Sequence, residues 1–208
     1  MFCWVGPEAQ LEPLNNLAIQ VPGLLEQTDL LVSQQRTVTK PSTGDLDSLL
    51  QNYLALTHEF DDCYREFIDA RSDGAYWSVD EDSDEYAVHQ FIFNRLCQPS
   101  FPKPTYKLRF RDGAAAGWLS RYWCCRLELL DGTAQVYKLM AATSCMEFEA
   151  DASRYRERAT RLKEETNQLA RRTLEAVNYL HCCLEGVVTA HGPWDIVERY
   201  NERKKLET

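Results

Sequence analysis

The longest segment without a helix-breaking residue constrains the fold most. Residues 151–185 contain neither proline nor glycine, and apolar or small side chains recur there at alternating spacings of four and three residues. This period is typical of one face of an α-helix. It predicts a single helix at about 151–188, roughly 55 Å long at 1.5 Å per residue, which exceeds the width of an average domain core. We therefore expect the helix to protrude from the domain or to form part of a helical bundle.

The apolar face of this helix has the spacing of a coiled-coil contact. We expect it to act as an interaction seam, through which the chain pairs with a second copy as a homodimer or binds another protein. An alternative stays open, in which the same face completes a bundle within one chain. The predicted seam consists of Tyr155, Ala159, Leu162, Leu169, Ala176, Leu180 and Val187.

Helical patterns also occupy the N-terminal part of the chain. Residues 7–36 are interpreted as short helical pieces divided at Pro13 and Pro22. Residues 45–70 carry apolar side chains at spacings of three, four and seven, which predicts one amphipathic helix with Ser42 or Thr43 as its cap. A short closing helix is expected at 194–206, after the long helix.

Residues 105–141 have the pattern of a small antiparallel β-meander. Apolar and basic side chains alternate over 105–111, as in a half-buried strand, and 118–130 are apolar on both faces, as in a central strand. Asp131–Gly132 is a typical hairpin turn that would return the chain along 133–141. The expected fold class is therefore α+β, with N-terminal helices and the meander forming a head at 1–150, and a coiled-coil-like long helix with the closing helix at 151–208.

Charge is divided unevenly along the chain. Residues 1–100 carry 17 acidic and 5 basic side chains, whereas 101–208 carry 15 acidic and 18 basic ones. The net charge of −9 argues against general coating of nucleic acid or anionic membrane. Basic side chains nonetheless gather on the 105–111 strand and at the start of the long helix, so a nucleic-acid-associated regulator is one alternative function. Its predicted anion-binding residues are Lys107, Arg109, Arg111, Arg154, Arg158 and Arg161.

The sequence contains no motif that indicates catalysis or a cofactor. Glycine-rich nucleotide loops and the hydrolase nucleophile elbow are absent from it. Zinc sites generally place two to four residues between paired ligands, whereas the close cysteine pairs are adjacent, at 124–125 and 182–183. We therefore predict no metal, no cofactor and no enzymatic activity. A thiol-dependent enzyme, in which the fold brings a cysteine to a histidine, is the remaining alternative.

The expected compartment is the cytoplasm or the nucleus. The first residues lack the pattern of a signal peptide, no N-glycosylation sequon occurs, and no apolar run is long enough to span a membrane. We therefore expect reduced cysteines and no membrane partner. The leading interpretation is a non-enzymatic protein–protein interaction protein, an assembly subunit or adaptor that acts through its long amphipathic helix.

Overall fold

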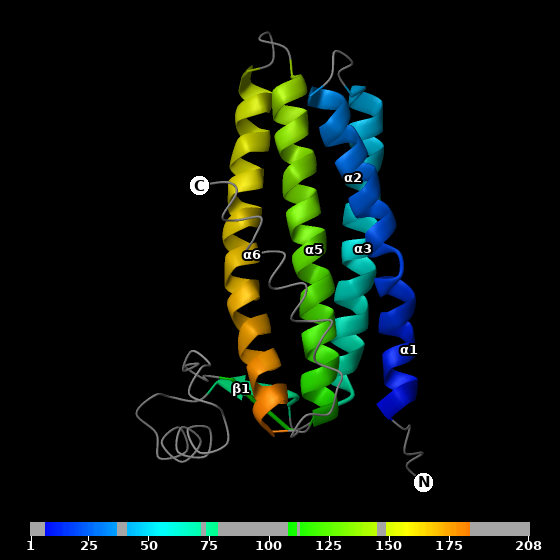
Figure 1. Ribbon diagram of the computed structural model, residues 1–208, viewed down its shortest axis with the longest axis vertical. Coiled ribbons are helices and arrows are strands. Elements are labelled where there is room, and N and C mark those ends of the chain that lie inside the picture. Colours follow the sequence, from blue (N-terminus) through cyan, green and yellow to red (C-terminus); the bar gives the residue numbers. More distant parts are fainter. Residues whose placement is uncertain are drawn as a thin grey trace. The chain divides into compact units, whose positions relative to one another are not determined.

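The computed structural model is all-α, and it describes residues 7–36, 41–71, 74–78, 108–111, 113–144 and 149–183. The predicted α+β class is wrong, because the only strands in these ranges are three residues long. The predicted closing helix at 194–206 and the last seam residue, Val187, lie outside the described residues. The elements are α1 (Pro7–Ala18), α2 (Val21–Arg36), α3 (Thr43–Asp69), β1 (Tyr76–Ser78), β2 (Leu108–Phe110), α5 (Gly113–Thr143) and α6 (Glu149–Cys183) (Figure 1).

The chain divides into two compact units. The first comprises Met1–Glu66 and Cys125–Leu169, and the second comprises Phe67–Cys124 and Ala170–Thr208. Helices α3, α5 and α6 each contribute a segment to both units.

The predicted helix at 45–70 is confirmed as α3. Ser42 caps its N-terminus: the Ser42 Oγ accepts a hydrogen bond from the Asp45 backbone N–H at 3.1 Å and donates one to Asp45 Oδ2 at 2.7 Å. Leu46, Tyr53 and Phe60, seven residues apart, are fully buried. The helix therefore forms for the reasons read from the sequence, a capping side chain and one continuous apolar face.

The break between the first two helices differs from the prediction. Pro13 lies inside α1, and the chain turns at residues 19–20 instead. Pro22 is the second residue of α2. In the first turn of a helix, the missing proline N–H costs no intrahelical hydrogen bond. Pro22 therefore marks a helix start, as predicted, whereas Pro13 is tolerated within a helix.

The predicted β-meander at 105–141 is also wrong. Its central strand, its hairpin turn and its return strand all belong to one helix, α5. In the first unit, the α5 segment lies between α3 and α6 (Figure 1), and Leu127, Leu129, Leu130 and Val136 are buried there. A helix covered on several sides is apolar all round, so it lacks the amphipathic period and resembles a buried strand in sequence.

Gly132 shows why a turn-like pair stands in the middle of α5. A Cβ placed on Gly132 would lie 2.5 Å from Cζ of the Tyr53 ring in α3. The Tyr53 hydroxyl in turn makes a 2.8 Å hydrogen bond with Thr28 Oγ1 in α2. Thr28 Oγ1 also donates a hydrogen bond of 2.9 Å to the Leu24 carbonyl oxygen. Glycine at 132 therefore serves the packing of α5 against α3, and the hydroxyl pair ties α3 to α2.

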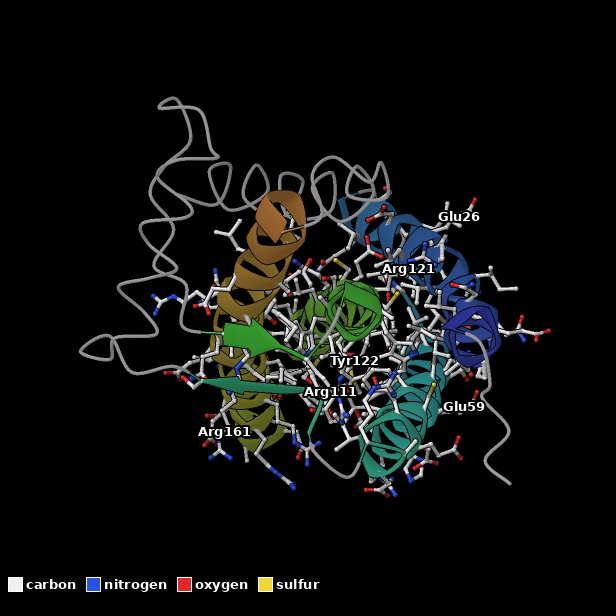
Figure 2. The ribbon with its side chains drawn as sticks, turned by 90° about the horizontal axis from the view of Figure 1, so that it is seen from below. Glu26, Glu59, Arg111, Arg121, Tyr122 and Arg161 are labelled. Carbon is white, nitrogen blue, oxygen red and sulfur yellow. The ribbon has the colours of Figure 1, made fainter. Side chains whose placement is uncertain are left out.

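An aromatic cluster forms the core of the second unit. Phe67 of α3 stacks on Trp118 of α5 with ring centroids 3.8 Å apart, and Trp118 stacks on Tyr122 one helical turn later at 5.6 Å. In Figure 2 the Tyr122 side chain lies among the others rather than at the outside. Four residues are about one helical turn, so Trp118 and Tyr122 lie on the same face of α5 and their rings can stack.

The strands form a two-stranded antiparallel ribbon that rests on this cluster. Tyr76 of β1 pairs with Phe110 of β2, and both rings contact Trp123, at centroid distances of 5.4 and 6.1 Å. Of the predicted strand at 105–111, the structure shows Leu108–Phe110, and its partner is β1 rather than residues 118–130.

Candidate interaction surface

The long helix predicted at 151–188 is confirmed over Glu149–Cys183, as α6. Its first part, up to Leu169, packs in the first unit, and its buried positions there are Ala152, Ala159 and Thr166. These three residues are spaced by seven, and all are small. Small side chains on a shared line let two helix axes approach closely. The Thr166 hydroxyl donates to the Leu162 carbonyl oxygen at 2.6 Å, so this polar group is satisfied although buried.

The structure divides the predicted seam residues into two groups. Ala159 and Ala176 are 4% and 0% exposed, so the chain itself covers them. Tyr155, Leu162 and Leu169 are half-buried, and part of each side chain reaches the surface. Leu180 belongs to α6, but its side chain, like Val187, is outside the described part of the structure.

The half-buried residues form a line of their own. Each follows a buried residue by three positions: Tyr155 follows Ala152, Leu162 follows Ala159, and Leu169 follows Thr166. Three residues of a helix correspond to 300°, so this line lies about 60° to one side of the buried line. We call Tyr155, Leu162 and Leu169 the α6 edge.

Tyr155 fixes one end of the α6 edge against α5. Its ring stacks on Tyr137 with centroids 6.0 Å apart. Arg158 lies over the Tyr137 ring at 5.6 Å and its Nη1 donates to the Tyr137 hydroxyl at 3.4 Å. The sequence does not single out Tyr137, because residues 133–141 carry the pattern of a strand. Once the segment is known to be helical, an aromatic residue in the contact to a neighbouring helix is unremarkable.

Arg126 is a second residue that the sequence did not single out. From α5 it reaches Asp61 of α3, with Nε 3.3 Å from Oδ1, and Glu165 of α6, with Nη2 4.0 Å from Oε1. Its side chain is only 14% exposed, and its buried Nη1 has no hydrogen-bond partner among the described residues. Arg126 therefore joins three helices of the first unit while one of its donors stays unsatisfied.

The helix members of the predicted anion-binding group lie at the surface of the first unit. Arg154, Arg158 and Arg161 are exposed, and in Figure 2 Arg161 extends outward on the α6 side, away from Glu59 of α3. Two of these charges are neutralised locally, because Arg154 lies 3.6 Å from Asp151 and Arg161 lies 2.5 Å from Glu157. Exposed pairs at these spacings are typical of a solvated helix surface.

The strand members of that group belong to the second unit. Arg111 is exposed, Arg109 lies on β2 with a side chain outside the described part, and Lys107 precedes the described residues of this strand. The basic residues of the strand and of the helix are thus described in separate units. The nucleic-acid alternative stays a prediction.

Cys63 of α3 does not have the surroundings of a reactive thiol. Burial, together with the nearby Glu66 carboxylate, raises the pKa of the Cys63 thiol, which disfavours the nucleophilic thiolate. His58 Nδ1 lies 3.0 Å from Asp62 Oδ2 on the same helix. Within the described ranges, no group of three or more histidine, cysteine or acidic side chains is arranged to hold a metal ion.

None of the described helices is both long enough and apolar enough to cross a membrane. Comparison of the chain with models of known protein families, with curated proteins and with solved structures finds no significant match.

Proposed function

We propose that this chain is a non-enzymatic assembly subunit that binds another protein along the α6 edge. The observation that carries the proposal is the partial exposure of Tyr155, Leu162 and Leu169 in one line on a 35-residue helix. The outer surface of a helix normally carries polar side chains, and large apolar residues concentrate on the face that is covered.

Covering the α6 edge would contribute appreciably to binding. Full burial of a leucine-sized side chain contributes about 1.5–3 kcal/mol relative to full exposure, so covering the exposed part of each residue, at most about a third, contributes up to about 0.5–1 kcal/mol. Three such contacts along about four turns amount to at most roughly 1.5–3 kcal/mol before polar contacts are added. Ala159 and Ala176 are already covered by the chain, so the contact uses the larger seam residues rather than the whole predicted seam.

The titratable and thiol groups described above support a structural rather than a catalytic role. The Tyr53 hydroxyl bonds Thr28, and burial raises the pKa of Tyr53 to about 12. The Cys63 thiol is kept protonated, and His58 pairs with Asp62 on an exposed helix surface. We place the protein in the cytoplasm or the nucleus, where its thiols stay reduced.

A single substitution on the α6 edge tests this function. Leu162→Asp places a charge on the edge, and Gln168→Asp places the same charge at an exposed position of the same helix. Tagged versions are expressed in cells of the source organism, and the size of the native complex is measured by gel filtration of the extract. We expect the wild type and Gln168→Asp to elute well above the monomer mass, and Leu162→Asp to elute as a monomer.

Thermal unfolding of the purified variants separates a binding defect from a folding defect. Because Leu162 is half-buried, Leu162→Asp should remain folded with a cooperative transition. A wild-type protein that elutes as a monomer from the extract, or a folded Leu162→Asp that elutes with the wild type, refutes the proposed function.

A further inference from the structure

The charges beside the α6 edge repeat with the same period as the edge itself. Asp151, Arg158 and Glu165 are seven residues apart, and each lies four positions before a residue of the edge. Four residues correspond to 400°, so the line of charges lies about 40° beyond the α6 edge, on the side away from the buried residues Ala152, Ala159 and Thr166. Its charges alternate, negative, positive and negative, and the sequence continues the alternation at Arg172.

Arg158 and Glu165, two members of this line of charges, both reach solvent. Arg158 is exposed, and the Glu165 side chain is 56% exposed. Their contacts within the chain are long: Arg158 with the Tyr137 hydroxyl at 3.4 Å, and Glu165 with Arg126 at 4.0 Å. Each therefore keeps donors or acceptors for a charged group outside the chain.

We propose that the partner of the α6 edge is a second copy of this chain, with the two α6 helices antiparallel around a two-fold axis near Leu162. This inference rests on the proposed function and names its partner. A two-fold axis brings the same surface of both copies together, so each residue meets the one at the mirrored distance from the axis. Leu162 then meets Leu162 of the partner subunit, and Tyr155 meets Leu169 of the partner subunit.

The charges select the antiparallel direction. In that arrangement the line outside the edge meets the same line of the other copy, as equivalent flanking positions do in antiparallel coiled coils. Arg158 then lies level with Glu165 of the partner subunit, and Glu165 lies level with Arg158 of the partner subunit. A parallel pair would instead bring this line to the opposite flank of the other helix, the flank that carries the small residues already buried within the chain. The alternation of charge is thus self-complementary in one direction only.

Two opposite charge reversals test the pairing. Arg158→Glu makes positions 158 and 165 both acidic, and Glu165→Arg makes both basic, so either variant alone places like charges opposite each other twice in a dimer. Exposed ion pairs change an equilibrium constant by up to about fivefold each. Replacing two attractions by two repulsions should therefore raise the dimer dissociation constant by roughly tenfold or more.

Mixing the two variants gives the sharpest result. In a mixed dimer every reversed position faces an opposite charge, while the contacts inside each chain remain those of the single variants. Sedimentation velocity at about 50 mM salt, where exposed charges are weakly screened, should show a dimer for the wild type, weakened dimers for each variant alone, and a restored dimer for the mixture. The double variant with both reversals should dimerise like the wild type.

The outcomes separate this inference from the proposed function. A purified wild-type monomer that still enters a Leu162-dependent complex in extracts overturns the homodimer and leaves the function standing. A dimer that neither reversal weakens, or a mixture that remains monomeric while both variants are folded, overturns the antiparallel pairing. A wild type that is monomeric both when purified and in extracts overturns both proposals.

Discussion

The packing of α5 against the Tyr53 ring predicts a sharp difference between two glycines of α5. Gly132 is buried against Tyr53, and an added Cβ would overlap the Tyr53 ring, with Cζ at 2.5 Å and Cε1 at 2.6 Å. Gly117, on the same helix, has no heavy atom within 4 Å of an added Cβ. Gly132→Ala and Gly117→Ala thus introduce the same methyl group, once into occupied space and once into free space.

The two substitutions should shift the free energy of unfolding in opposite directions. Replacing a glycine inside a helix by alanine stabilises by about 1 kcal/mol where the space is free. At position 132, overpacking costs about 1–3 kcal/mol. Moving the ring also strains the hydrogen bond between the Tyr53 and Thr28 hydroxyls, and a buried group left unsatisfied costs about 1–3 kcal/mol more. After the helix-propensity gain, we expect Gly132→Ala to be about 2–3 kcal/mol less stable than the wild type and Gly117→Ala to be up to 1 kcal/mol more stable.

Urea unfolding followed by circular dichroism measures both effects. A loss of 2–3 kcal/mol corresponds to a fall in Tm of about 4–12 °C for a chain of this size. Tyr53→Leu removes the ring atoms that the added Cβ would overlap, so Gly132→Ala in that background should cost much less than in the wild type. The reasoning is refuted if Gly132→Ala is as stable as Gly117→Ala, or if its cost is unchanged in the Tyr53→Leu background.

Three further substitutions test other parts of the first unit. Ser42→Ala removes the cap of α3 and should cost about 1 kcal/mol in urea unfolding, whereas Ser48→Ala, at an exposed position inside the helix, should cost nothing. Arg126→Met should unfold with a free energy within about 1 kcal/mol of the wild type, because it removes half-exposed ion pairs and an unsatisfied buried donor together. Arg126→Ala should be less stable than Arg126→Met, because it also loses the packed side-chain stem. Burial raises the pKa of Tyr53 from 10.0 to about 12, so this residue ionises at a lower pH in the unfolded chain than in the folded one. The wild type should therefore lose stability relative to Tyr53→Phe as the pH rises from 10 to 12. Equal pH dependence of the two proteins in that range contradicts the buried, neutral hydroxyl.

Sequence reasoning succeeded where one face of a helix was covered and the other was not. Helix α3 and the long helix α6 both show this contrast, and their observed bounds, Thr43–Asp69 and Glu149–Cys183, lie close to the predicted ranges. In each case the apolar period and the polar opposite face arise from the same physical cause, a single line of contact with the rest of the protein.

The failure at α5 has the complementary cause. A helix with neighbours on several sides has no polar face. Its sequence is therefore rich in apolar residues, but these residues show no helical repeat. Asp131–Gly132 has the sequence of a hairpin turn. Glycine is needed at 132 for another reason, because a side chain there would overlap the ring of Tyr53, which is distant in sequence. The hydrophobic pattern of a segment indicates which of its faces is exposed to solvent. It does not indicate where a contact with a distant residue requires a small side chain.

The same distinction explains how much of the candidate interaction surface could be predicted. The alternating spacing located the apolar face of α6, but it could not divide that face between contacts within the chain and contacts outside it. Side-chain size makes the division visible once the structure is known: Ala152, Ala159 and Thr166 are small where α6 is buried, and Tyr155, Leu162 and Leu169 are large where it is half-buried. Small residues at the covered line allow α6 to pack closely within the chain, and a helix that served only its own bundle would carry polar residues beside that line. The large apolar residues at the margin are the ones that the proposed partner would cover.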